Sequence, residues 1–177
     1  GLYLYTIAGE FKSLRPHFAG ECTRVVGVVG AEDITIRPDG LVAYVSSDDR
    51  RSALSGRPKP GAIFAYDLSP HRGGLTNLTP DAREDFHPHG IGLYAGDGRP
   101  HRLFVVNHPS GLHRDEGDSP AHSIEIYEVV DDRLVHKRTL LDDLLVSPND
   151  VVPMGPEQFY VSNDHGSGSS LGRMLED

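Results

Sequence analysis

Three short stretches of this sequence place oxygen-bearing or imidazole side chains directly before an apolar segment. They are Glu32-Asp33, His89 and Asn149-Asp150. Carboxylate and amide oxygens from two separate stretches are the hard ligands that Ca²⁺ prefers, with roughly 6 to 8 of them per ion. Zinc fits poorly, because the sequence has no Cys₂His₂ or His-x-x-x-His spacing. The alternative, that the Asp and Asn residues only cap turns between strands, stays open.

The pair His89 and His108 could carry proton-transfer chemistry. The two residues are 19 positions apart; the first begins one predicted strand and the second ends its neighbour. In an antiparallel pair the end of the second strand returns beside the start of the first, so the two imidazoles can meet. One ring can then act as a general base while the other orients it. The chain has 10 histidines, so a structural role for both remains the alternative.

These residues occupy matching positions of an internal repeat. In each unit the polar stretch precedes a short apolar strand, a turn with glycine follows, and a second strand ends in small or polar residues. The steps from Asp33 to Gly90 and from Gly90 to Asp150 are 57 and 60 residues long. Such a period suits a four-stranded unit with long loops. The second strands are predicted at Ala43–Ser47, Phe104–His108 and Phe159–Asn163.

Further strand-like segments extend the first two units. Ala62–Leu68 and Ser123–Val129 have strand-forming composition, and the second alternates polar with apolar side chains. Leu134–Leu140 suits a fourth strand at the edge of a sheet, with its charges facing solvent. Each unit is therefore predicted to be an antiparallel meander, which is the blade of a β-propeller. The sequence divides into a leading segment 1–30, blades at about 31–86 and 87–147, and an incomplete blade from 148.

Three blades cannot close a propeller, because closed rings have typically 4 to 8. Either the chain is part of a longer protein, or copies of it associate to complete the ring. We expect the first, because the third unit stops after its second strand, near Ser167–Ser170, with no recognisable outer pair. At the other end, Gly1–Ile7 could form a strand or a short helix.

Composition narrows the class of protein. The 177 residues suit one domain, and 20 Gly and 13 Pro among short apolar segments favour an all-β chain. The formal charge of -9 argues against a general nucleic-acid binder, whose phosphate affinity needs clustered Lys and Arg. No apolar run of about 18 residues is present to span a bilayer. Because the chain starts at Gly1 rather than Met, association with lipid or a membrane surface through a lost N-terminal region stays open.

Several motifs, taken in order, resemble the paraoxonase family of arylesterases and lactonases. The likeness runs from about Cys22 to His165, and Pro-His-Gly-Ile and Val-Val-Asn-His-Pro are its most specific parts. The segments that carry it are Ala31–Ile34, Pro38–Leu41, Pro60–Ile63, Pro88–Ile91, Leu103–Pro109, Asn149–Val151, Gly155–Tyr160 and Asn163–His165.

The resemblance implies a six-bladed β-propeller with two calcium ions in its channel. It implies that Glu32 and Asn149 bind the catalytic ion. It assigns Asp33, Asp150 and the main-chain carbonyl of Ile91 to the deeper structural ion. His89 and His108 match the histidine dyad of the family, and Asp164 would lie near the site without an assigned ligand role.

Parts of the family pattern are absent from the chain. Further calcium ligands, an Asn and an Asp-Asn pair from blades four and five, have no match here. Cys22, the one cysteine, matches the first partner of a family disulfide whose second partner near the C-terminus is missing. These gaps favour a fragment that lacks the C-terminal half of its propeller, and they suggest an oxidising compartment for the whole protein. We expect a secreted, periplasmic or membrane-associated protein.

The resemblance implies calcium-dependent hydrolysis of lipophilic lactones first and aryl esters second, with phosphotriesters as a side activity. The present half alone is expected to be inactive, because it would keep only part of the catalytic calcium cage. Two alternatives share the fold. One is a non-catalytic propeller, either a binding scaffold or a strictosidine-synthase-like relative. The other is a gluconolactonase-like enzyme, whose ligand pattern lacks the Val-Val-Asn-His-Pro strand.

Overall fold

The computed structural model describes residues 9, 11–13, 15, 17–69, 73–96, 100–109 and 122–176. Within these ranges the chain forms ten strands and two short helices, so it is nearly all-β. Gly1–Ile7, for which the sequence allows a strand or a short helix, lie outside the described part. Neither of the helices in the described ranges has the length and apolar content that a membrane span requires.

The first sheet is an antiparallel meander of four strands in sequence order. Its strands are β1 (Ala31–Ile36), β2 (Val42–Ser47), β3 (Ala62–Asp67) and β4 (Leu75–Asn77). The helix α2 (Arg50–Leu54) lies in the connection from β2 to β3. It begins where the side chain of Asp49 accepts a hydrogen bond from the backbone N–H of Ser52, which satisfies one of the free donors of the first turn.

The second sheet repeats the same topology, and the third contains only the first two strands of it. The strands of the second sheet are β5 (Pro88–Tyr94), β6 (Arg102–Asn107), β7 (Ser123–Val130) and β8 (Arg133–Leu141). Those of the third are β9 (Pro148–Pro153) and β10 (Phe159–Asn163), and the helix α3 (Ser170–Glu176) follows them. The prediction of an all-β chain made of antiparallel meanders is therefore confirmed, and the architecture is consistent with part of a propeller. The total of six blades stays a prediction.

Strand β6 of the second sheet is buried on both faces, which explains its unbroken apolar run. Leu103 and Val105 point toward the first sheet, where they pack with Tyr44 and Ile63. The alternate residues of β6 point toward the third sheet, where Phe104 and Val106 pack with Val151. The four apolar side chains of β6 are fully buried. Burying each of them stabilises the fold by about 1.5 to 3 kcal/mol.

Candidate functional site

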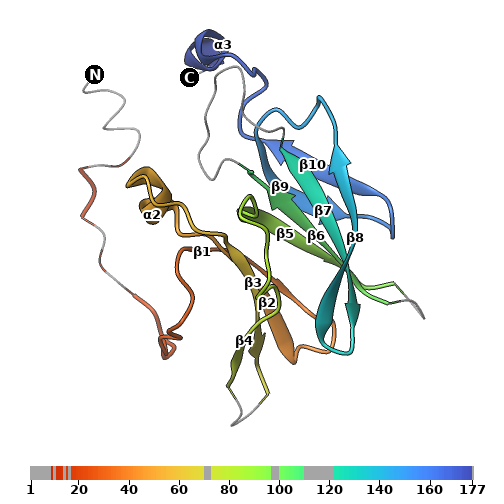
Figure 1. Ribbon diagram of the computed structural model, residues 1–177. Coiled ribbons are helices and arrows are strands. Elements are labelled where there is room, and N and C mark those ends of the chain that lie inside the picture. Colours follow the sequence, from red (N-terminus) through yellow and green to blue (C-terminus); the bar gives the residue numbers. More distant parts are fainter. Residues whose placement is uncertain are drawn as a thin grey trace.

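The innermost strands of the three sheets lie side by side. Strand β5 contacts β1 on one side and β9 on the other, as Figure 1 shows. The approach of β5 to β9 is so close that a Cβ atom at Gly90 would lie 2.5 Å from Cα of Asp150. Only glycine leaves room there. The starts of these three strands, where the polar stretches of the sequence lie, are therefore gathered at one place.

A β-bulge occurs near the start of each inner strand. In β1 three residue steps from Ala31 to Ile34 oppose two steps in β2, and the pairing of β5 with β6 shifts in the same way between Pro88 and Ile91. The pairing of β9 with β10 is irregular next to Asp150. A bulge breaks the alternation of side chains between the two faces of a sheet, and bulges often redirect side chains beside active sites. In β1 the result is that Glu32 and Asp33, although consecutive, both reach β5.

His89 links the first and third sheets. Its Nε2 lies 3.3 Å from Oε1 of Glu32, and its Nδ1 lies 2.9 Å from the main-chain oxygen of Asn149. A carbonyl oxygen only accepts hydrogen bonds, so Nδ1 carries the proton that it donates to Asn149. In the neutral ring Nε2 is therefore the nitrogen without a proton, and it faces Glu32. The second oxygen of Glu32 lies 3.3 Å from a guanidinium nitrogen of Arg50.

A row of three imidazoles begins at His89. The rings of His89 and His108 have centroids 5.0 Å apart at 60°, so the predicted pair is in contact. His108 also contacts His122, with centroids 4.6 Å apart at 71°. His89 and His108 are buried. Reading the sequence missed His122, which directly precedes β7; only its place in the fold reveals it, because its position matches no part of the repeat.

Asp33 and Asp150 have the same local environment in the first and third sheets. The backbone N–H of Asp33 donates to Oγ of Ser46 and that of Asp150 donates to Oγ of Ser162. In each case Oδ1 accepts from the N–H of the following residue, at 2.7 Å. The other oxygen of Asp33 accepts from the N–H of Ile91 at 2.7 Å, so these two residues are brought together. Asp150 lies against Gly90.

The side chain of Asn149 is oriented by Asp164. Its Nδ2 donates to Oδ2 of Asp164 at 3.1 Å, which leaves Oδ1 of the amide as an acceptor. Asp164 follows directly after β10, at the position that His108 occupies after β6. The structure thus gives Asp164 a contact with one of the predicted ligand residues.

A second cross-sheet pair was missed from the sequence. Oδ1 of Asp48 lies 2.9 Å from Nδ1 of His87, and both side chains are buried. Asp48 follows β2 as His108 follows β6, and the backbone N–H groups of these two residues make matching bonds, to Gly30 and His87. Extending the repeat by one residue beyond each second strand would have identified Asp48, His108 and Asp164 as equivalent.

The predicted ligand residues have the donor atoms that calcium prefers, but they are too few to surround an ion. Their donors are carboxylate, amide and carbonyl oxygens, as calcium requires. In the part of the chain that the structure describes, no group of three or more His, Cys, Asp or Glu side chains is close enough to hold a metal ion. Glu32 and Asn149 are both connected to His89, whereas Asp33 and Asp150 bond to backbone amides of strands. These residues can contribute to a calcium site but cannot complete one.

The amino-acid sequence matches one family model and several curated proteins. Residues 15–177 match the family model described as Arylesterase. The chain is 38% identical over 152 residues to serum paraoxonase/arylesterase 2 of Gallus gallus, which is 81% of this chain and 40% of that protein. It is 32% identical over 169 residues to serum paraoxonase/arylesterase 1 of Mus musculus, which is 90% of this chain and 45% of that protein. It is 33% identical over 165 residues to serum paraoxonase/lactonase 3 of Oryctolagus cuniculus, which is 89% of this chain and 44% of that protein. The chain spans less than half the length of these curated relatives.

Proposed function

Since the chain belongs to the arylesterase (paraoxonase) family, we propose that it supplies the histidine centre of an enzyme that hydrolyses esters and lactones. The names of its relatives include arylesterase, lactonase and paraoxonase. We infer lipophilic lactones as the preferred substrates, aryl esters as the second class and phosphotriesters as a side activity. The chain corresponds to only part of each relative, so the activity is proposed for the whole protein and not for these 177 residues alone.

The observation that carries the proposal is the hydrogen bond between Nδ1 of His89 and the main-chain oxygen of Asn149. It fixes the tautomer in which Nε2 can accept a proton, as a general base must. In the proposed mechanism Nε2 takes a proton from water while the water oxygen bonds to the carbonyl carbon of the substrate. The imidazolium that forms is stabilised by Glu32, 3.3 Å away. The bond from carbon to the leaving oxygen then breaks, and His89 returns the proton to that oxygen.

His108 is proposed to hold the His89 ring in place. It contacts that ring from β6, and its burial restricts the positions it can adopt. The product of a lactone is then a hydroxy acid, and that of an aryl ester is a carboxylic acid and a phenol.

We propose Ca²⁺ as the cofactor of the whole protein. Glu32 and Asn149 would hold the catalytic ion, and Asp33, Asp150 and the carbonyl of Ile91 would hold the structural one. The support is the oxygen-only donor set and the free Oδ1 that Asp164 leaves on Asn149. When bound, the catalytic ion would polarise the substrate carbonyl as a Lewis acid. Because the present residues cannot complete the cage, the isolated chain is expected to be inactive.

The proposed setting is outside the cytoplasm. The word serum stands in the names of the relatives, and Cys22 is exposed. An exposed thiol could pair with a second cysteine elsewhere in the whole protein, which would require an oxidising compartment.

The decisive experiment is His89→Gln in the whole natural protein, with hydrolysis of a simple lactone as the assay. Gln keeps a hydrogen-bond donor but cannot act as a base at neutral pH, so kcat should fall by about 10²-fold or more. His17→Gln, which changes an exposed histidine of the leading segment, is the matched control and should leave kcat unchanged. An unchanged kcat in His89→Gln removes this residue from the role of base.

A further inference from the structure

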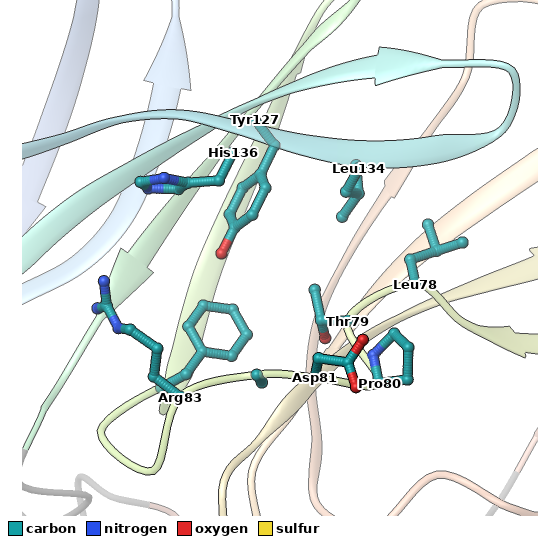
Figure 2. Close-up of a pocket in the computed structure, with 10 residues that line it drawn as sticks. Leu78, Thr79, Pro80, Asp81, Arg83, Tyr127, Leu134 and His136 are labelled. Atoms are coloured by element: carbon teal, nitrogen blue, oxygen red, sulfur yellow. The ribbon is translucent and has the colours of Figure 1, made fainter.

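A cavity of about 340 Å³ lies against the outer strands of the second sheet, under the segment that follows the first sheet. One wall is the segment from Leu78 to Phe86, which connects β4 to β5, and the other is formed by β7 and β8. Figure 2 shows Tyr127, Leu134 and His136 facing that segment across the cavity. Its volume falls within the range of roughly 300 to 1,000 Å³ that is usual for sites of small ligands.

The cavity has an aromatic and aliphatic lining. The rings of Phe86 and Tyr127 meet edge to face, with centroids 6.3 Å apart at 71°. Leu78, Ala82 and Leu134 add apolar surface and pack against the core cluster between the two sheets. An aromatic ring placed here would gain apolar burial and could contact the aromatic pair edge to face.

Tyr127 supplies a hydrogen-bond donor to this space. Its hydroxyl group points into the cavity in Figure 2, and it forms no hydrogen bond with any residue in the described part of the chain. Burial, followed by the negative charge of Glu125, raises the pKa of Tyr127 to about 12. The hydroxyl group therefore keeps its proton across the physiological range and can donate it to an acceptor on a ligand.

Charge around the cavity argues for an uncharged ligand. Arg83 is the one cation on the segment from Leu78 to Phe86, and its guanidinium group is shared by Asp85, at 2.9 Å, and Glu125, at 3.4 Å. Asp81 adds a further carboxylate to the lining. A ligand anion would meet these carboxylates, and a ligand ammonium group would offer no acceptor to the hydroxyl group of Tyr127.

Glu125 is itself satisfied within the protein. This buried carboxylate accepts hydrogen bonds from Ser123 at 2.8 Å and Thr139 at 2.6 Å. Nε2 of His136 donates to it as well, at 2.7 Å. A ligand is therefore not needed to neutralise Glu125, and the hydroxyl group of Tyr127 is a neutral donor that can serve a ligand.

The geometry points to a second binding site in this cavity, for a small uncharged aromatic carbonyl compound such as an aryl ketone or aryl ester. The aromatic ring would lie among Phe86, Tyr127 and Leu134, and the carbonyl oxygen would accept the hydrogen bond of Tyr127. The lining residues come from a loop and from outer strands, whereas the residues proposed for hydrolysis lie at the starts of the inner strands. The site binds its ligand without hydrolysing it, and it stands whether or not His89 is a general base.

The test uses acetophenone, which carries the carbonyl group of an aryl ester without a bond that can be hydrolysed. Titration into the whole natural protein, followed by methyl NMR, should shift the signals of Leu78, Ala82 and Leu134. Tyr127→Phe, which keeps the ring but removes the donor, should weaken binding about fivefold. Ala82→Trp, which fills the cavity, should abolish the shifts. Tyr160→Phe, at an exposed position on β10, is the matched control and should bind as the parent does.

Two comparison ligands test the charge argument. Benzoate and benzylammonium have similar rings but carry a negative and a positive charge, and both should bind more weakly than acetophenone. The proposal is overturned if the acetophenone shifts occur only outside the cavity, or if binding survives Ala82→Trp unchanged. Equal affinity in Tyr127→Phe, or tighter binding of either ion, overturns the ligand assignment. A loss of hydrolysis in His89→Gln with unchanged acetophenone binding separates this site from the proposed hydrolytic one.

Discussion

Oδ1 of Asp48 lies 2.9 Å from Nδ1 of His87, and this hydrogen bond joins the end of β2 to the residue before β5 inside the protein. His87 lies two residues before His89, and its main-chain oxygen accepts from the N–H of His108 at 3.1 Å. The pair between Asp48 and His87 thus supports the backbone that carries both members of the proposed dyad.

Replacing Asp48 should destabilise the fold. Asp48→Ala would leave the buried Nδ1 of His87 without its acceptor, at a cost of about 1 to 3 kcal/mol in the free energy of unfolding. Asp48→Asn keeps an acceptor oxygen and should cost less. Urea unfolding followed by circular dichroism measures both, with Asp143→Ala at an exposed position as the control. Equal stability of the parent and Asp48→Ala would show that the pair contributes nothing.

Acid should destabilise the second sheet and its contact with the segment that connects β4 to β5, through Glu125. Burial alone would raise the pKa of Glu125, but its hydrogen bonds and the charge of Arg83 outweigh burial and lower the pKa below its ordinary value of 4.5. A carboxyl group with a depressed pKa in the folded state stabilises the protein above the pKa of the unfolded state, and this stabilisation is lost as the pH falls through the folded pKa.

The corresponding measurement is the free energy of unfolding between pH 7 and about pH 3. The parent should lose stability below about pH 4.5, and Glu125→Gln should have a shallower slope in that range because one proton-linked group is gone. Glu84→Gln, at an exposed position, should keep the slope of the parent. Identical slopes in the parent and Glu125→Gln would contradict the assignment.

Removal of divalent metal should affect both activity and stability of the whole protein. If calcium is held by Glu32, Asn149 and their neighbours, EDTA should abolish lactone hydrolysis and lower Tm, because an ion that binds only the folded state stabilises it. Added Ca²⁺ should restore both. If EDTA changes neither Tm nor hydrolysis, the calcium proposal is wrong and a non-catalytic propeller becomes the better interpretation.

His122 should influence the rate without acting as the base. It contacts His108, which in turn contacts His89, so it can position the dyad through His108. We expect His122→Asn to lower kcat about tenfold, equivalent to about 1.4 kcal/mol, with an unchanged KM. If His122→Asn instead lowers Tm and weakens substrate binding relative to the parent, the role of His122 is purely structural.

Much of the arrangement was predictable because the repeat is encoded in the order of residue types. Glu32, His89 and Asn149 share a position in the repeat, and inner strands of successive blades must be neighbours, so their proximity followed from the pattern. The second sheet was also predictable, since the unbroken apolar run of β6 requires burial on both faces.

The features that could not be predicted from the sequence are contacts of single side chains and irregularities of the backbone. His122 lies between residues 110–121, which the structure does not describe, and the start of β7, so no periodic pattern marks it. The pair of Asp48 and His87 depends on two loops meeting. The bulge in β1 is equally hidden, because strict alternation would have sent Glu32 and Asp33 to opposite faces.

In a regular strand the alternation of side chains between two faces ties the direction of each polar residue to the packing of its neighbours. The bulges at the starts of the inner strands break this link. Beyond each bulge, side chains such as Ile91 and Val151 fill the contacts between sheets, while within the bulge of β1 the side chain of Glu32 turns toward His89. Each inner strand therefore fills the core with its later residues and presents polar side chains at its start. One additional residue in each inner strand thus lets a single element serve both the packing of the sheets and the proposed site.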